Sequence, residues 1–477
     1  MSEEDIRSQR IEKLEKLKKM GIDVYGRTFN KTDISLIKEG DVNVKVAGRI
    51  MAVRKHGGSS FLDIKDNSGK IQLYFKKNMA DEISLSIFEN LDIGDIIGVD
   101  GDAFRTKTGE LTIVIKHLSI LAKSINPLPE KWHGLRDVEI RFRKRYLDLI
   151  MNNDVREVFN KRIRMLQHMR EFLNKRDFIE VDTPMMHPIP GGAIARPFIT
   201  HHNTLDMSLY LRIAPELYLK RLLVGSFEKI YEINRSFRNE GISPLHNPEF
   251  TMLELYSAYG DYREMMEITE LLITYLAERI NGGLSIEYQG GKIDLTLPWK
   301  KITWNEIFTS AGLQNWRDID RTIRHAEELG IQIADDDRND IFGILDTIFK
   351  KKIQPNLLNP TFVYEYPSEI SPLAKSYRDN SQIAERFELF IGGLEIANAY
   401  SELNDPFEQH KRFRESAGNV PENDRSKKVD EDYIEALEYG MPPAGGLGIG
   451  VDRLVMLMTD SPSIREVIFF PLLRTKK

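Results

Sequence analysis

The chain contains no cysteine among its 477 residues. This absence excludes disulfide scaffolds, thiol nucleophiles, iron–sulfur clusters and cysteine zinc sites, and it fits a reducing compartment. The sequence also lacks an apolar run of the roughly 18–20 residues that a membrane span needs. Its first residues are charged and polar, with no apolar core, so we expect no signal peptide. Together these absences predict a cytoplasmic protein without a membrane partner.

The composition is that of a globular protein with several domains. The hydrophobic fraction is 41% and the charged fraction is 29%, which excludes collagen-like, coiled-coil and disordered classes. The formal net charge of −6 argues against a nucleic-acid binder that relies on charge alone. At roughly 100–200 residues per domain, this length predicts about three domains.

The first part of the chain predicts a helix followed by a small barrel. Apolar residues recur at helical spacing over residues 3–20, within an extension that covers residues 1–41. This helix either packs on the next domain or offers a basic face to RNA. Over residues 42–123 the pattern changes to three strands, a helix and two further strands. That order is typical of the five-stranded OB barrel, which often binds oligonucleotides, although fold alone does not assign function.

The rest of the chain predicts one large α+β unit. A proline-containing linker at residues 124–135 precedes it, and the unit covers residues 136–477. Long amphipathic helices flank strands that predict a single large antiparallel sheet. The predicted strands cover residues 209–213, 228–238, 249–259, 385–391 and 394–403. A helical insertion is expected near residues 315–355.

A nucleotide clamp is predicted at residues 237–250, where a strand, a polar loop and a returning strand follow one another. Arg238 lies at the end of the first strand, and a planar guanidinium can bind a phosphate through two hydrogen bonds. Phe250 on the returning strand can stack on an adenine. The alternative is a surface hairpin with exposed charges.

Glycines at residues 445–450 lead from a strand into an apolar helix that carries Arg453 in its first turn. The run lacks the Gly-Lys-Ser/Thr of a P-loop, and no βαβ unit surrounds it as in a dinucleotide site. Glycines allow a ligand to approach the backbone, and a helix N-terminus with an arginine favours a phosphate. The alternative is close packing of the helix on the sheet, with Arg453 in a surface ion pair.

Two strands place carboxylates among apolar side chains. Period two puts Glu254 and Tyr256 on one face of the first strand. It puts Asn398, Tyr400 and Glu402 on one face of the second strand. Because a buried carboxylate is unfavourable unless a cation meets it, the two strands together predict a pocket for an ammonium group. For either strand alone, a glutamate paired with an internal lysine or arginine is favoured.

A magnesium site is predicted at Glu388 and Glu395, because two carboxylates in adjacent segments can hold Mg²⁺ against phosphate oxygens. Strict alternation along the strand turns Glu395 away from Glu402. A β-bulge near residues 392–393 would correct that direction. Without a bulge, Glu395 is merely exposed.

These segments resemble the class II aminoacyl-tRNA synthetases. Residues 237–240 (Phe-Arg-Asn-Glu) resemble motif 2, and the glycine-rich helix start with Arg453 resembles motif 3. The helix at 154–176 and the segment after it resemble motif 1, through which the family dimerises. An OB barrel ahead of this core marks the lysyl, aspartyl and asparaginyl subgroup. Further segments resemble the lysyl-tRNA synthetases, at residues 143–149, 190–198, 211–221 and 400–405.

The resemblance implies a Mg²⁺-dependent homodimer that joins L-lysine to tRNA(Lys) through a lysyl-adenylate formed from ATP. For ATP it implies Arg238, Glu240, His246, Phe250 and Arg453, with the two arginines as catalytic residues on the phosphates. For lysine it implies Gly192, Glu216, Glu254, Tyr256, Asn398, Tyr400 and Glu402, with Glu216 at the α-amino group and Glu254 and Glu402 at the ε-ammonium. It assigns the metal to Glu388 and Glu395, and the anticodon to Arg54, Phe61 and Gln72.

Three alternative functions stay open. An aspartyl- or asparaginyl-tRNA synthetase is disfavoured by the acidic pocket, because aspartate would need a lysine or arginine and none lies on the strand faces named above. A lysyl transferase that modifies a protein is disfavoured by the OB region, which relatives of that kind lack. A catalytically inactive tRNA-binding paralogue is disfavoured by the presence of both arginines and both metal-binding glutamates.

Overall fold

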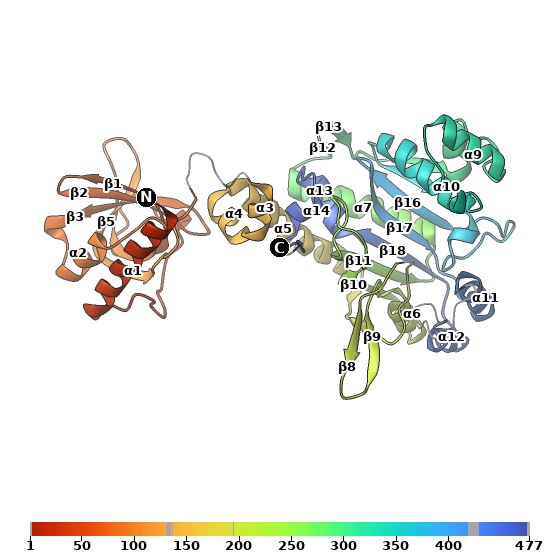
Figure 1. The fold of residues 1–477 in the computed structure, drawn as a ribbon, viewed down its shortest axis with the longest axis horizontal. Helices are drawn as coiled ribbons and strands as arrows, with labels where there is room; N and C mark the ends of the chain where they lie inside the picture. Colours follow the sequence, from red (N-terminus) through yellow and green to blue (C-terminus); the bar gives the residue numbers. More distant parts are fainter. Residues whose placement is uncertain (1, 130–134, 136, 194, 418–428, 475–477) are drawn as a thin grey trace. The chain divides into compact units, whose positions relative to one another are not determined.

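Figure 1 shows the fold of this computed structural model, which describes residues 2–129, 135, 137–193, 195–417 and 429–474. The chain divides into two compact units, Met1–Arg136 and Asp137–Lys477. Within the predicted linker, residues 130–134 lie outside the described residues. Along the described ranges, every helix is too short or too polar to cross a membrane.

The N-terminal unit begins with helix α1 (Glu3–Lys19), whose capping residue Ser2 accepts a hydrogen bond from the backbone N–H of Asp5. Five strands then form a closed barrel in the order β1-β2-β3-β5-β4. They are β1 (Val44–His56), β2 (Ser59–Lys65), β3 (Lys70–Lys76), β4 (Ile96–Arg105) and β5 (Leu111–Ala122), with helix α2 (Glu82–Glu89) between β3 and β4. This architecture confirms the predicted OB barrel.

Aliphatic side chains fill the barrel because alternate residues of each strand point inward. Val46, Leu62 and Leu73 are fully buried in its core. Leu14 and Leu17 of α1 belong to the same apolar cluster. Helix α1 therefore packs on the barrel and has a structural role within this unit.

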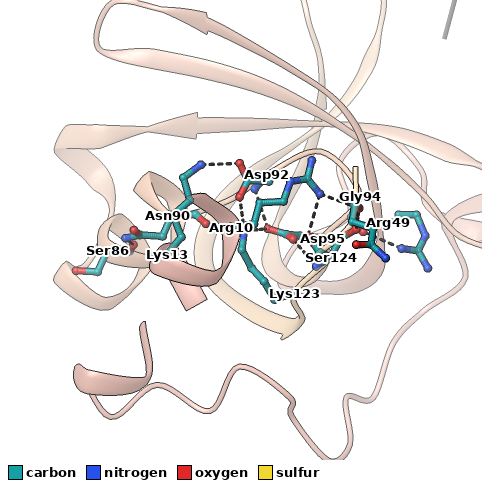
Figure 2. Close-up of polar contacts among 11 residues, drawn as sticks. Arg10, Lys13, Arg49, Ser86, Asn90, Asp92, Gly94, Asp95, Lys123 and Ser124 are labelled. Carbon is teal, nitrogen blue, oxygen red and sulfur yellow. Dashed lines mark hydrogen bonds and ion pairs between the residues drawn. The ribbon is translucent and has the colours of Figure 1, made fainter. Parts of the chain in front are cut away.

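A polar network also joins α1 to the barrel, as Figure 2 shows. Lys123 is fully buried, and its ammonium lies 2.6 Å from Asp92 and 2.7 Å from Asp95. The same ammonium donates to the backbone carbonyl of Asn90 at 2.9 Å, so each of its three protons has an acceptor. Lys13 of α1 adds a second cation to Asp92 at 2.5 Å. Among these four side chains, two lysines therefore face two aspartates.

The C-terminal unit is built on a sheet with the strand order β14-β15-β16-β17-β18-β11-β10-β6. Its central strands pair antiparallel, as predicted, whereas the outermost pairs at both ends are parallel. The strands are β6 (Ile179–Glu180), β10 (Lys229–Phe237), β11 (Glu249–Ala258), β14 (Lys300–Thr303), β15 (Thr361–Tyr364), β16 (Arg386–Ile391), β17 (Leu394–Ser401) and β18 (Ala444–Gly450).

The strand predicted at residues 209–213 does not belong to the large sheet. It is β9 (Met207–Leu211), which pairs with β7 (Met186–His187) and β8 (Ile199–His202) in a separate three-stranded sheet. Alternation along a sequence identifies a strand, but it does not identify the partner, which depends on contacts with distant residues. A two-stranded hairpin of β12 (Ser285–Tyr288) and β13 (Gly291–Asp294) is also separate.

Helices cover the large sheet (Figure 1). α5 (Asn153–Asn174) and α7 (Tyr262–Asn281) contribute Met165 and Leu272 to the main apolar core, and both side chains are fully buried. The other α-helices are α3 (Val138–Arg143), α4 (Arg145–Met151), α6 (Glu216–Val224), α8 (Trp304–Ser310), α9 (Ile319–Glu328), α10 (Ile341–Ile348), α11 (Pro406–Ala417), α12 (Glu431–Glu438), α13 (Val451–Met458) and α14 (Ile464–Val467). α9 and α10 lie in the stretch where helices were expected as an insertion.

Candidate active site

A cavity of about 700 Å³ opens on the central strands of the large sheet. Its walls come from β11, β17 and β18, the loop after β10, and the starts of α6 and α13. The sequence-predicted residues that line it are Gly192, Glu216, Arg238, Glu240, His246, Phe250, Glu254, Tyr256, Glu395, Asn398, Tyr400, Glu402 and Arg453. Segments almost 200 residues apart thus meet in one cavity because β17, β18 and β11 are neighbours in the sheet.

Strand β18 supplies a glycine floor between the two acidic strands. Gly448 lies opposite Glu254 on one side and Asn398 on the other. Gly446 lies opposite Tyr256 in the same way. A Cβ atom at Gly446 would lie 1.8 Å from a carboxylate oxygen of Glu402, so only glycine leaves room for this carboxylate.

Glu216 and Glu402 are joined by a lysine that the sequence analysis did not place in the pocket. Lys220 of α6 is fully buried; its ammonium lies 2.6 Å from Glu216 and also forms an ion pair with Glu402. Tyr400 donates its hydroxyl hydrogen to Glu216 at 2.5 Å. Glu402 is therefore paired with an internal lysine, the alternative favoured for either strand alone, although no lysine or arginine lies on the strand faces named from the sequence. Lys220 was not placed there because only strand faces were considered, whereas it lies one helical turn after Glu216.

The pKa values of the ionisable groups at this end of the cavity are shifted by different causes. Burial lowers the pKa of Lys220, but the charges of Glu216 and Glu402 outweigh it and hold that pKa well above the ordinary value. Burial and the charge of Glu216 raise the pKa of Glu402 to about 8, against the opposing effect of Lys220. Lys220 therefore stays protonated. Glu402 is only partly ionised near neutral pH.

Glu254 is a buried acidic side chain with which no described residue forms an ion pair. Its side chain is 6% exposed, and no hydrogen bond or ion pair from the described residues reaches its carboxylate. Burial, with the charges of Glu216 and Glu232, raises its pKa to about 8. A ligand cation in the cavity would favour the ionised carboxylate, because an opposite charge lowers the pKa of an acid.

Two arginines lie near the nucleotide-clamp end of the cavity. Arg238 holds its guanidinium 5.1 Å from the centre of the Phe250 ring. Its Nε is buried and, among the described residues, has no hydrogen-bond partner. Arg453 donates to the backbone carbonyl of Glu395 at 2.9 Å, and it lies 3.4 Å from Nε2 of His246. A buried guanidinium nitrogen without an acceptor suits an anionic ligand such as a phosphate.

A β-bulge directs Glu395 into the cavity. The register of β16 on β17 shifts between Leu389, which pairs with Ala397, and Phe390, which pairs with Glu395. Ile396 is the extra residue, and its insertion brings Glu395 to the face of the cavity. The bulge that a cavity-facing Glu395 requires is therefore present, but its extra residue lies three positions after Gly393 and not at the glycines of the turn.

Glu388, the other predicted metal ligand, does not line the cavity, as far as the described residues show. Its carboxylate accepts hydrogen bonds from Arg386 at 2.6 Å and from the hydroxyl of Tyr366 at 2.8 Å. Burial raises the pKa of Glu388, and the negative charge of Glu395 adds to that effect. The described residues contain no group of three or more side chains fit to bind a metal ion. A carboxylate pair still suits Mg²⁺, which keeps water and phosphate oxygens among its ligands.

Two further charged residues lie beside the cavity and were not predicted from the sequence. Arg386 of β16 donates to the side-chain oxygen of Asn398 at 3.2 Å and so fixes that amide. Asp452 accepts from Arg162 of α5 at 2.5 Å and from the backbone N–H of Thr251 at 2.6 Å. Charged residues within apolar segments were the available signal, but their partners lie on distant elements.

The predicted anticodon residues lie on adjacent barrel strands. Phe61 is half-buried and lies outside the apolar core, with its ring centre 5.0 Å from that of Tyr74. Arg54 is exposed and makes two hydrogen bonds to Asp63, at 2.8 and 3.1 Å. Gln72 accepts a hydrogen bond from the hydroxyl of Thr112 at 2.9 Å.

Comparison with known proteins places both units. Residues 137–474 match the family described as tRNA synthetases class II (D, K and N), and residues 44–121 match the OB-fold nucleic acid binding domain. The chain is 56% identical to a lysine–tRNA ligase of Carboxydothermus hydrogenoformans, over 98% of this chain and 97% of that protein. It is 52% identical to a protein of the same name from Pelotomaculum thermopropionicum, over 98% and 94%. It is 51% identical to another from Syntrophomonas wolfei, over 99% and 97%.

Proposed function

Because the chain belongs to the class II tRNA synthetases (D, K and N), we propose that it catalyses the ATP-dependent attachment of L-lysine to tRNA(Lys). The reaction forms lysyl-adenylate with release of pyrophosphate, and then transfers lysine to tRNA with release of AMP. Relatives that match nearly the whole chain carry the name of this activity. The observation that carries the proposal is the cavity. Among the described residues, the carboxylate of Glu254 has no ion-pair partner there and Nε of Arg238 has no hydrogen-bond acceptor, so a ligand with an ammonium group and a phosphate would satisfy both.

Lysine recognition is assigned to the acidic side of the cavity. Glu216 faces the α-amino group, whereas Glu254 and Glu402 face the ε-ammonium. Tyr256, Asn398 and Tyr400 form the walls between them. Gly192 belongs to the same pocket, since a Cβ there would lie 3.1 Å from the Cβ atoms of Ala214 and Glu216. A neutral amino acid would leave the carboxylate of Glu254 without its cation, which is unfavourable in a buried site.

The first chemical step needs no side-chain nucleophile, because the lysine carboxylate is already ionised. This carboxylate attacks the α-phosphorus of ATP in line, so the protein contributes positioning and charge stabilisation. Arg238 and Arg453 bind the phosphates, while Glu240, His246 and Phe250 hold the nucleotide, with the Phe250 ring on the adenine. Glu388 and Glu395 would hold Mg²⁺, which supplies positive charge to the phosphate oxygens when bound.

The barrel is assigned to tRNA. We infer that residues 42–123 bind the anticodon, with Phe61 stacked on a base and Arg54 and Gln72 at base edges. Stacking of this kind contributes about 1–3 kcal/mol per base. The exposed position of Arg54 and the half-buried ring of Phe61 support this assignment.

A homodimer in the cytoplasm completes the proposal. The exposed apolar side chains of Ile163, Ile179 and Met186, on and after the helix that resembles motif 1, support a dimer surface. The absence of cysteine fits the reducing compartment in which tRNA is charged.

The proposed function is tested by ATP–pyrophosphate exchange with each of the twenty amino acids. We expect exchange with lysine and none with aspartate or asparagine. Exchange that depends on aspartate would overturn the assignment of the pocket, and charging of tRNA(Lys) by the full-length protein checks the second step.

A further inference from the structure

Lys220 is a buried charged residue that the proposed reaction does not use. Its ammonium has no exposed surface, and it lies between Glu216 at the start of α6 and Glu402 after β17. The ring of Tyr400 lies 5.4 Å from the same ammonium. Lys220 itself is not among the residues that line the cavity, so its effect on a ligand must pass through its two partners.

The two carboxylates depend on this lysine for their positions. Glu216 and Glu402 belong to elements far apart in the chain. The negative charge of each carboxylate makes ionisation of the other less favourable. Among the described residues, Lys220 is the cation that forms ion pairs with both. Gly446 leaves the space in which Glu402 extends, so the carboxylate is confined by the floor on one side and held by Lys220. Removing the ammonium would leave two buried carboxylates that repel each other.

The charges of the pocket also match those of the substrate. The carboxylates of Glu216, Glu254 and Glu402 carry three negative charges when ionised, and Lys220 cancels one of them. The remaining two negative charges equal the two ammonium groups of lysine. The carboxylate of the substrate is left for the arginine side of the cavity.

We propose that Lys220 is a positioning residue for lysine recognition, whose buried ammonium holds Glu216 and Glu402 at fixed points against their mutual repulsion and sets the charge of the pocket to that of a diamino acid. The inference deepens the proposed function and rests on it. Lys220 acts through its two partners and takes no part in the chemical step.

A structural role alone would give a different result, and the barrel offers the matched control. Lys123 is equally buried and is also shared by two carboxylates, but it lies in the other unit and is not among the described residues that line the cavity. Replacing either lysine removes a buried ion pair and lowers stability. Only the replacement of Lys220 should change lysine recognition.

The first experiment compares Lys220→Met and Lys123→Met in the full-length protein by lysine-dependent ATP–pyrophosphate exchange. Methionine keeps the length of the side chain and removes the charge. We expect the lysine KM of Lys220→Met to rise about 100-fold, with the ATP KM within about twofold of wild type. Lys123→Met should lower the melting temperature and keep the lysine KM.

The second experiment restores the missing ammonium. Lys220→Ala removes three carbons and the amine, the volume of propylammonium. Added propylammonium should lower the raised lysine KM in a saturable way. Propanol, which has nearly the same shape and no charge, should have no effect, and neither compound should alter the lysine KM of Lys123→Ala.

The outcomes separate this inference from the proposed function. If wild type shows no lysine-dependent exchange, the proposed function fails first. If wild type is active and Lys220→Met keeps its lysine KM within about threefold, the positioning role is wrong and the proposed function stands. Equal rises of the lysine and ATP KM values, or equal rescue by propanol, would show a merely structural lysine and would also overturn the inference.

Discussion

Lys123 and Lys220 are two fully buried lysines, each shared between two carboxylates, in the two units of the chain. In the barrel, burial raises the pKa of Asp92, but Lys123 and Lys13 outweigh it and hold that pKa below its ordinary value. In the catalytic unit, burial and Glu216 outweigh Lys220 and raise the pKa of Glu402 to about 8. The comparison teaches that a buried ion pair is structural where its charges balance, and serves a ligand where excess carboxylate faces a cavity.

The largest effect is expected for Glu402→Gln. The substitution leaves Lys220 with Glu216 alone and removes one negative charge from the pocket, so the lysine KM should rise about 100-fold or more in pyrophosphate exchange. The ATP KM should stay close to that of wild type. An unchanged lysine KM would show that Glu402 does not contribute to lysine binding. Lys220 would then have no role in recognition and would be a structural residue like Lys123.

Asp95→Asn is the corresponding change in the barrel. It leaves the buried ammonium of Lys123 with Asp92 and two neutral acceptors, and breaking such a pair costs about 3–5 kcal/mol. We expect the barrel to unfold at lower denaturant concentration, as followed by circular dichroism. Pyrophosphate exchange should keep its lysine KM, and a shift of that KM would contradict the division of roles between the units.

Phe61→Ala tests whether the barrel contributes to tRNA binding and not to adenylation. Loss of one stacking platform of about 1–3 kcal/mol should raise the tRNA KM by roughly fivefold to 150-fold. Exchange without tRNA should be unaffected, because the barrel supplies no residue to the adenylation cavity. Equal loss of both activities would make Phe61 a core residue of the barrel.

The smallest effect is expected from pH. Glu254 has a pKa of about 8 in the empty pocket, so it is protonated below that pH and must release a proton to meet the ammonium of lysine. The lysine Kd should therefore rise about tenfold for each unit that the pH falls below about 8. Calorimetry at pH 7 in two buffers of different ionisation enthalpy should detect proton release, and Glu254→Gln should reduce it to the part that comes from Glu402, whose pKa is also about 8.

The barrel should not share this dependence. The lysines that hold the pKa of Asp92 below its ordinary value keep it ionised near neutrality. Because the folded pKa is depressed, the stabilisation by Asp92 is present above the unfolded pKa and is lost only as the pH falls through the folded value. The stability lost on Asp92→Asn should therefore be the same at pH 6 and pH 8, and a loss that differed between the two would contradict an Asp92 that stays ionised.

Local patterns predicted much of the fold and of the cavity. The order of elements along the barrel followed from the change of period, and the parity of β17 showed that Glu395 faces the cavity only if a bulge is present. Lys220 could not be found in this way, because periodicity on α6 does not say which strand its face will meet. The separate sheet of β9 was missed for the same reason, since alternation identifies a strand and not its partner.

The glycine floor has a consequence for redesign of the pocket. Because Gly446 and Gly448 belong to a central strand of the sheet, they present main chain to the cavity, and main chain cannot be exchanged by substitution. Variants that accept bulkier or shorter analogues must therefore come from the walls. An enzyme of altered specificity would be sought by randomising α6 and β11, while β18 is left as it is.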